Sequence, residues 1–437
     1  MEINNPSGWR SRNYLDQIKK GSLFKAIGVA ASFIAMPIAI EYLGQEMFGV
    51  WTTLLSVISW AIFLDFGIGI GLRNKVAEGI ANNNNEYIIK YISTSYTLIG
   101  IIVTSIYLII LIIAFNISWQ EIFNTRNIPE IALRNSVLIV AAFILLNFLI
   151  GLIGSILGGM QKTAIVALNQ MAVNIILIIF LCTLIKISNP SIIYISWIYG
   201  IGTVIPNLAI SLWFFNKNPK YLPKISIHRK YVKSILSIGI QFLIIQIAVL
   251  VIFTTDKLII IQLFGPDYVT NYEIVFKLFA SLTLIHSMIL MPLWSAYTDA
   301  YHRHDLSWIK AMLGKQLVIF IFLVILTLLL IIFAKKIIIW WIGDNIKTDS
   351  YLVICMGIYV VISMWNNVFA FFINGIGKIK IQMYTAIIAM AINIPLSIYF
   401  GKNLGYGVSG VIMATTVSLS IAAIVLPIQT YFILKDR

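Results

Sequence analysis

Residues 316–334 read QLVIFIFLVILTLLLIIFA, a run without a single charged side chain. A helix of about 20 mostly apolar residues is long enough to cross the hydrocarbon core of a bilayer. This stretch therefore predicts a transmembrane helix. Similar apolar runs occur along the rest of the chain, at about 22–42, 48–72, 91–115, 135–158, 164–185, 191–214, 235–263, 269–296, 351–373, 383–400 and 407–434.

The whole chain has a membrane composition. Of its 437 residues, 60% are hydrophobic and 11% are charged, against about 25% charged in an ordinary soluble domain. Every backbone amide in lipid must be paired internally, and the runs are about twice as long as barrel strands need to be. We therefore expect an all-α polytopic membrane protein with about twelve transmembrane helices, and we exclude a soluble globular protein.

The charge balance is basic, with 31 Lys and Arg residues against 17 Asp and Glu residues. When the loops are assigned alternately to the two sides, 21 of the basic residues fall on the side of the N-terminus and 7 on the other. Cytoplasmic loops carry such an excess, which places both termini in the cytoplasm. Residues 1–21 lack a signal-peptide cleavage pattern, so we expect them to be retained. Topology explains the positive charge without a nucleic-acid partner.

The chain divides into two halves. Residues 216–234 are rich in Lys and contain two prolines, which indicates a cytoplasmic linker between an N-terminal lobe (1–215, helices 1 to 6) and a C-terminal lobe (235–437, helices 7 to 12). At an offset of 221 residues, Leu43, Gly44, Glu46, Trp51 and Glu78 fall on Phe264, Gly265, Asp267, Tyr272 and Asp299. A second echo pairs Gly159, Lys162 and Asn174 with Gly375, Lys378 and Asn393. Each half has an even number of spans, so both halves enter the membrane with the same orientation, which favours two parallel repeats. The alternative is chance similarity between apolar stretches.

Ionisable residues inside the spans are the candidates for function, because each costs at least about 2.5 kcal/mol at a helix centre. They lie in the first two helices of each half, which predicts a central cavity lined by helices 1, 2, 7 and 8. The set is Lys25, Asp65, Arg73, Asp256, Lys257, Glu273, Lys277 and His286.

Some of these residues have a second interpretation. Lys25 lies near a helix end and could extend its ammonium to the interface. Glu273 and Lys277 are spaced i, i+4 and could neutralise each other. His286 could titrate near physiological pH or be a hydrogen-bonded structural residue.

The acids differ from one another. Asp65 is the deepest, which favours a functional role. Asp256 points about 100° around its helix from Lys257, so the two cannot form one tight pair on one face.

Other patterns indicate structure and not chemistry. Asp65-Phe66-Gly67 and the alternating glycines 67–71 lack the strand that a phosphate- or nucleotide-binding motif requires. The small residues Gly67, Gly71, Gly154 and Gly158 are typical of close helix packing or bending.

Catalytic and cofactor signatures are not recognisable in the sequence. It has no Ser/His/Asp set, no Walker loop and no cofactor fingerprint, so we expect no enzyme, no cofactor and no ATP hydrolysis by this chain. Cys182 and Cys355 lie inside apolar runs and predict neither a disulfide nor a metal site.

Three stretches carry a family resemblance. The first runs from Tyr42-Leu43-Gly44 through Phe48-Gly49-Val50-Trp51 to Asp65-Phe66-Gly67-Ile68-Gly69 and Leu72-Arg73-Asn74-Lys75. The second comprises Thr255-Asp256-Lys257 with Phe264-Gly265 and Pro292-Leu293-Trp294-Ser295-Ala296. The third comprises Asn374-Gly375-Ile376-Gly377-Lys378 with Gln382, Asn393-Ile394-Pro395-Leu396, Gly405, Gly407 and Gly410. Their order and spacing resemble the O-antigen-type polysaccharide flippases of the multidrug/oligosaccharidyl-lipid/polysaccharide exporter superfamily.

The resemblance implies a two-lobed antiporter-like fold with a central cavity in the bacterial inner membrane. It also implies a substrate, an oligosaccharide on a polyprenyl pyrophosphate, flipped from the cytoplasmic to the outer leaflet. A pyrophosphate needs cationic partners, and the cations near the inferred cavity are Arg73, Lys25, Lys257 and Lys277. Coupling to H⁺ or Na⁺ would fall to Asp65, Asp256 and His286, and the alternative is a membrane potential that acts on the cations.

Two other functions remain open. A cation-coupled multidrug exporter of the same fold would use the intramembrane acids, but bases outnumber acids near the inferred cavity. A membrane oligosaccharide polymerase would be expected to carry a large external loop, and the largest loops here, around 116–134 and 335–350, are short.

Overall fold

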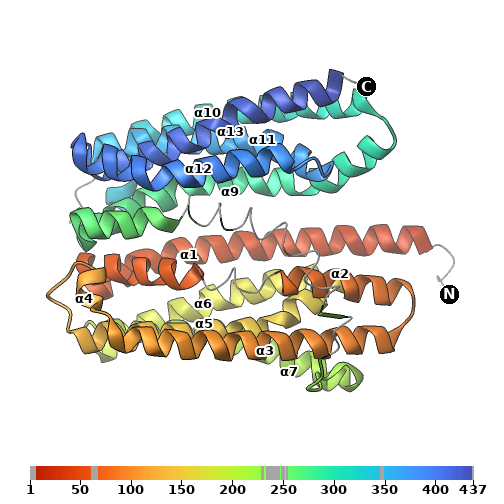
Figure 1. The fold of residues 1–437 in the computed structure, drawn as a ribbon, viewed down its shortest axis with the longest axis horizontal. Helices are drawn as coiled ribbons and strands as arrows, with labels where there is room; N and C mark the ends of the chain where they lie inside the picture. The colour runs from red at the N-terminus through yellow and green to blue at the C-terminus, as the bar shows by residue number, and fades with distance from the viewer. Residues whose placement is uncertain are drawn as a thin grey trace. The chain divides into compact units, whose positions relative to one another are not determined.

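The computed structural model describes residues 6–60, 67–227, 231–232, 247, 251, 254–344 and 349–435. Within these ranges every secondary-structure element is helical, and the long helices are strongly apolar (Figure 1). The chain is an all-α polytopic membrane protein. It forms two compact units, Met1–Leu243 and Ile244–Arg437. The lobe and linker boundaries inferred above, 1–215, 216–234 and 235–437, stay predictions.

The helices follow the predicted apolar runs. In the first unit they are α1 (Pro6–Ser59), α2 (Ile68–Ala81), α3 (Asn85–Asn116), α4 (Trp119–Ile122), α5 (Glu130–Gly159), α6 (Thr163–Ile187), α7 (Ile192–Lys217) and a 3₁₀ turn (Pro219–Tyr221). In the second unit a helical stretch at 254–264 precedes α9 (Pro266–His302), α10 (Leu306–Ile342), α11 (Ser350–Gly375), α12 (Lys380–Ile398), a π turn (Tyr399–Asn403) and α13 (Gly407–Lys435).

Ten helices in the described ranges are long and apolar enough to cross a membrane. Two of the twelve expected runs account for the difference. Helix α1 covers the run 22–42 and most of the described part of the run 48–72, and the two parts meet at Gly44, which has a positive φ of 73°. Glycine adopts this conformation without a Cβ clash. The run 235–263 lies largely outside the described residues.

Side-chain caps fix where several helices begin. Asn84 accepts a hydrogen bond from the amide of Tyr87 (2.9 Å) at the start of α3, and Asp305 accepts one from Trp308 (3.0 Å) at the start of α10. These bonds satisfy amides that have no partner in the first helical turn. The hydrogen bonds from the Ser307 hydroxyl and the Trp308 amide also hold the pKa of Asp305 below its ordinary value.

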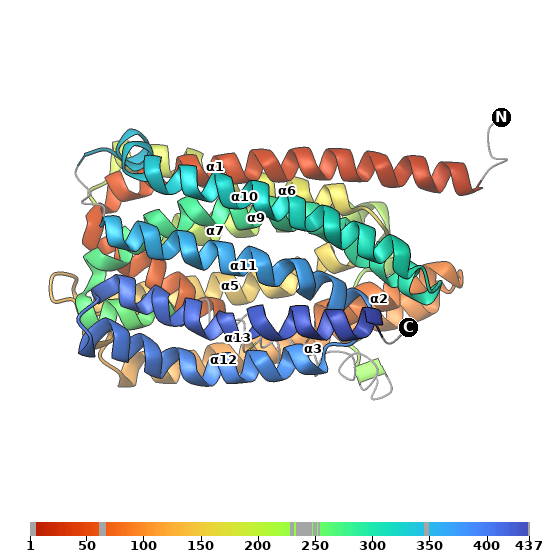
Figure 2. The same cartoon turned by 90° about the horizontal axis from the view of Figure 1, so that it is seen from above.

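Each unit has its own apolar core. In the first unit α2, α3, α5 and α7 bury a shared cluster that contains Leu72, Ile92, Ile156 and Phe214. In the second unit α9, α10, α11 and α13 bury another, and Figure 2 shows α11, α12 and α13 running side by side. The apolar faces of these helices are packed into the two clusters, and the candidate site residues lie at other positions on the same helices.

The chain that follows α7 is tied to α3. The Tyr221 hydroxyl donates to Asn85 Oδ1 (2.7 Å), the amide of Lys224 donates to Ser93 Oγ (3.1 Å), and the amide of Ser226 donates to Thr97 Oγ1 (3.2 Å). We call residues 218–227 the α3 strap. Ser93 and Thr97 are one helical turn apart, so the strap runs along one face of α3.

The two units repeat one close helix contact. Gly159 ends α5, and a Cβ built on it would lie 2.6 Å from the main-chain oxygen of Arg73. Gly375 ends α11, and a Cβ there would lie 2.8 Å from the main-chain oxygen of Trp294. Arg73 and Trp294 are 221 residues apart, the offset of the sequence repeat. The predicted sequence repeat is therefore matched in the structure by a repeated contact, in which a glycine at a helix end lies against a main-chain oxygen.

Not every expected glycine packs closely. Gly158 lies against the side chain of Arg73, as the pattern predicted, because a Cβ there would be 3.1 Å from Arg73 Nε. A Cβ added to Gly154 would meet no atom within 4 Å, so the prediction of close packing is wrong there. Gly67 instead caps the start of α2 with a φ of 73°.

We expect Gly159→Ala to destabilise the folded protein by about 1–3 kcal/mol, because the added methyl group meets backbone that cannot move alone. Gly154→Ala is the matched control on the same helix. It should stabilise by up to about 1 kcal/mol through helix propensity. The loss of monodisperse protein on heating in detergent measures the thermal stability of both variants. Equal thermal stability of the two variants would contradict the proposed contact.

Candidate functional site

Asp256 is buried in the second unit, with an exposed fraction of 2%. The Tyr272 hydroxyl donates to its Oδ2 at 3.0 Å, and Thr415 Oγ1 lies 3.0 and 3.2 Å from its two carboxylate oxygens. Asn393 Nδ2 in turn donates to Thr415 Oγ1 at 3.0 Å. The stretch 254–264, α9, α12 and α13 thus converge on one carboxylate. Neutral hydroxyl donors make its burial tolerable.

No cation pairs with Asp256 among the residues that the structure describes. The neighbouring Lys257 instead forms an ion pair with Glu273, with Nζ and Oε2 2.7 Å apart. This confirms that Asp256 and Lys257 serve different faces. A buried carboxylate bonded only to hydroxyl groups is chemically suited to accept a proton or a small cation, because burial disfavours its charged form.

The Lys257–Glu273 pair differs from the i, i+4 pair that the sequence suggested for Glu273. Both side chains are largely shielded, with exposed fractions of 15% and 18%. Gly265, with a φ of 102°, turns the chain between 254–264 and α9. Residues on either side of this turn therefore face each other across the hairpin. Lys277 lies further along α9, within electrostatic range of Glu273 and Lys257.

His286 belongs to a different part of α9. It lies fourteen residues beyond Tyr272, or about 21 Å along the helix axis, so it does not join the Asp256 cluster. Its side chain is fully buried, and neither ring nitrogen has a hydrogen-bond partner within the described ranges. The expected alternative of a hydrogen-bonded structural histidine is not seen. Asp65, the other acid assigned to coupling, lies outside the described residues.

The predicted headgroup cations of the first unit are both exposed. Lys25 lies on α1 and Arg73 on α2, and in the described part of the chain neither has an ion-pair partner. The neighbouring lysines are paired, since Lys75 Nζ lies 2.8 Å from Glu78. The same contact holds the pKa of Glu78 below its ordinary value and that of Lys75 above it. Among the described residues, the charges of Arg73 and Lys25 thus have no partner.

Gly158 shapes the surroundings of Arg73. The guanidinium arm crosses α5 where Gly158 offers no side chain. Its Nε would be 3.1 Å from a Cβ at that position. The arm therefore lies along α5 in a defined path, and the residue as a whole is exposed.

Comparison with known proteins shows the family of this chain. The description "Polysaccharide biosynthesis protein" matches residues 21–297, which is more than half of the chain. The chain belongs to this family. A second description, MatE, matches residues 242–399. Together they place the chain among the polysaccharide flippases of the multidrug/oligosaccharidyl-lipid/polysaccharide exporter superfamily.

Individual relatives are distant but match along most of their length. A protein of Yersinia pseudotuberculosis named for O-antigen export is 23% identical over 82% of each chain. An O-antigen transporter of Salmonella typhimurium is 22% identical over 91% of this chain and 92% of its own. The chain is thus a membrane transporter of the polysaccharide exporter type.

Solved structures show the same fold. An inward-facing multidrug resistance transporter of the MATE family is 16% identical and covers 93% of this chain and 95% of its own, with a TM-score of 0.78. An outward-facing one covers 96% of both chains at a TM-score of 0.67 and 16% identity.

Sequence reasoning found Asp256 but missed the residues that hold it. Tyr272 and Asn393 appeared only as repeat or family positions, and Thr415 carried no signal at all. Asp256 and Tyr272 are 16 residues apart, as are Lys257 and Glu273, and the Gly265 turn lies between the members of each pair. Pairing residues across this turn could therefore have predicted both contacts, which join the two helices of one hairpin.

Proposed function

We propose that the chain flips a polyprenyl-pyrophosphate-linked oligosaccharide from the cytoplasmic to the outer leaflet of the bacterial inner membrane by alternating access. Family membership and O-antigen transporters as relatives support the substrate class. The excess of basic residues in alternate loops supports cytoplasmic termini. The chemistry is transport, with no cofactor and no catalytic step.

The observation that carries the proposal is that Arg73 and Lys25 are exposed cations without an ion-pair partner among the described residues. A pyrophosphate is recognised by charge-assisted hydrogen bonds, bidentate from arginine and single-point from lysine. Lys257 is the weaker candidate because Glu273 already holds its ammonium at 2.7 Å. Lys277 shares that mixed-charge environment. We therefore assign first capture of the headgroup to the first unit, with Lys257 and Lys277 as later contacts.

Ion coupling in this proposal centres on Asp256. Uptake of H⁺ or Na⁺ would neutralise the carboxylate that Tyr272 and Thr415 now hold. The ion shifts the transport equilibrium only by the difference between its affinities for the two states. Asp65 and His286 remain candidates for the same role.

A second candidate is a cation-coupled multidrug exporter. The MatE match over residues 242–399 and the multidrug transporters among the solved structures favour it. In that case Asp256 would face a cationic drug or its coupling ion, and Arg73 would be without function.

Deleting the protein in its own cell distinguishes the two. The flippase predicts accumulation of a polyprenyl-linked saccharide on the cytoplasmic leaflet, where it resists periplasmic glycosidase but is degraded after membrane permeabilisation. Restored export on re-expression is the control. Unchanged export in the deletion strain, together with increased sensitivity to cationic dyes, would instead favour the drug exporter.

A further inference from the structure

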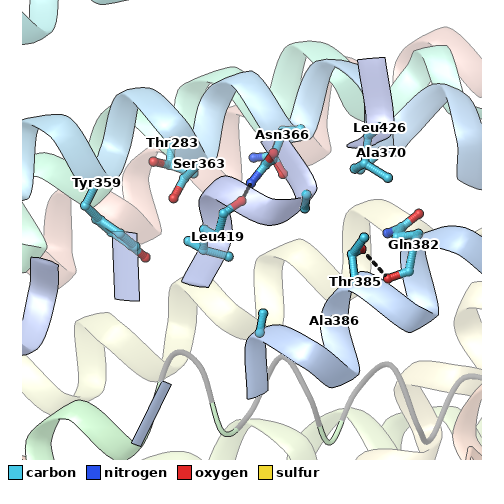
Figure 3. Close-up of a pocket in the computed structure, with 13 residues that line it drawn as sticks. Thr283, Tyr359, Ser363, Asn366, Ala370, Gln382, Thr385, Ala386, Leu419 and Leu426 are labelled. Atoms are coloured by element: carbon cyan, nitrogen blue, oxygen red, sulfur yellow. Dashed lines mark hydrogen bonds between the residues drawn. The ribbon is translucent and has the colours of Figure 1, made fainter. Parts of the chain in front are cut away.

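The second unit contains a cavity of about 200 Å³ that no step described so far uses. It lies among α9, α11, α12 and α13, and Figure 3 shows its lining side chains. At about 30 Å³ per liquid water, the space would hold roughly six or seven waters. It is therefore too large for a single dehydrated ion and is comparable to one sugar ring.

The lining of this cavity is polar but carries no formal charge. Its polar members are hydroxyl and carboxamide side chains, and its remaining members are apolar. Neither Asp256 nor any lysine of the second unit is among them. Groups of this kind hydrogen-bond neutral ligands and offer nothing to pair with a pyrophosphate.

Two carboxamide oxygens in the cavity are left without a partner among the described residues. Asn366 Nδ2 donates to the Leu419 main-chain oxygen at 3.0 Å, which fixes the amide and turns Oδ1 away from that bond. A flipped amide would set two oxygens against each other. Gln382 Oε1 is the second. A buried acceptor without a donor costs about 1–3 kcal/mol, so a ligand or water that drew either carboxamide toward the cavity and donated to its oxygen would relieve this cost.

A third acceptor lies beside Gln382. The hydroxyl of Thr385 donates to the main-chain oxygen of Gln382 at 2.8 Å (Figure 3), so its hydrogen is used and its lone pairs remain. The cavity is thus lined by carboxamides and hydroxyls, which can both accept and donate hydrogen bonds. A sugar ring matches such a lining, because each of its hydroxyls donates one hydrogen bond and accepts others.

Small side chains keep the space open. Ala370 of α11, Ala386 and Ala389 of α12 and Ala422 of α13 all line the cavity. Leucine at any of these positions would enter the volume. The site can therefore be blocked without changing a polar group.

We propose that this cavity is a saccharide subsite, which receives one sugar ring of the lipid-linked oligosaccharide. The inference rests on the proposed function. It adds a division of labour: cations of the first unit bind the pyrophosphate, and uncharged amides and hydroxyls of the second unit bind the sugar.

The test compares two probes on purified full-length protein in nanodiscs. One probe is synthetic polyprenyl pyrophosphate, and the other is the polyprenyl-linked saccharide extracted from cells that lack this protein. Gln382→Met should weaken binding of the saccharide lipid by about two- to tenfold, as expected for one hydrogen bond. Ala386→Leu should weaken it by about tenfold or more through steric exclusion. Neither should change binding of the sugar-free lipid.

Tyr384→Phe is the matched control, because Tyr384 lies on α12 with an exposed fraction of 60% and outside the cavity lining. It should bind both probes as the unsubstituted protein does. Equal affinities of all variants for the saccharide lipid, or an equal loss for both lipids, would overturn the subsite and leave the flippase standing. Failure of the unsubstituted protein to bind either lipid would overturn the proposed function itself.

Discussion

Arg73→Ala is expected to weaken binding of polyprenyl pyrophosphate by about ten- to a hundredfold and to stop export of the saccharide. A charge-assisted contact contributes about 1.5–3 kcal/mol, and each 1.4 kcal/mol is about tenfold in affinity. Arg73→Lys should retain part of the activity, because the charge survives and the bidentate fork does not. Lipid binding in nanodiscs and export in cells measure the two effects separately.

Two further variants show whether the position of Arg73 matters as well as its charge. Gly158→Ala places a methyl group against the Arg73 arm and should displace it, giving a loss smaller than that of Arg73→Ala. Lys75→Ala removes a nearby charge that Glu78 already neutralises and should have little effect on binding. Full export by correctly inserted Arg73→Gln protein would remove the headgroup role.

Asp256→Asn is expected to remove the dependence of transport on an ion gradient while leaving the protein folded. Asparagine keeps the shape of the side chain and can still accept from Tyr272, but it cannot take up a proton or carry a charge. Typical coupling free energies correspond to about five- to 150-fold, so gradient-driven transport should fall by a factor in that range. Transport into vesicles with imposed H⁺ or Na⁺ gradients measures it.

Neighbouring threonines on α13 give the control for Asp256. Thr415→Val removes a donor to the carboxylate and should shift the ion concentration at which transport is half-maximal. Thr416→Val removes only a bond to the main-chain oxygen of Ile412 on its own helix and should not. If transport by Asp256→Asn keeps its full gradient dependence, Asp256 is not the coupling group.

The sequence predicted the helices well because the property that forms them is local. A run of about 20 apolar residues must be helical in lipid, whatever it packs against. The break at Gly44 falls between the predicted runs 22–42 and 48–72. The positive φ that makes this break is a backbone conformation, which an apolar pattern does not encode.

The contacts of the candidate site could be predicted only in part, because they depend on how helices are rotated against one another. Asp256 was found by its charge, but its partner Thr415 comes from α13, 159 residues further along the chain. A buried threonine has no distinctive pattern. Helical spacing suggested Lys277 as a partner of Glu273, and the structure adds Lys257, whose Nζ lies 2.7 Å from Glu273 Oε2 across a turn. Similarly, Gly154 and Gly158 look alike in sequence and share one face of α5, but only Gly158 lies against a residue of α2.

The α3 strap orders a part of the first unit that has little helix of its own. Residues 218–227 are held on α3 through the hydroxyl of Tyr221 and the amides of Lys224 and Ser226. Fixing the backbone of one residue costs about 1–2 kcal/mol of conformational entropy, and these hydrogen bonds offset part of that cost. The two strap amides can exchange their hydrogens with solvent only when the strap opens, so their exchange rates report how often this segment leaves α3.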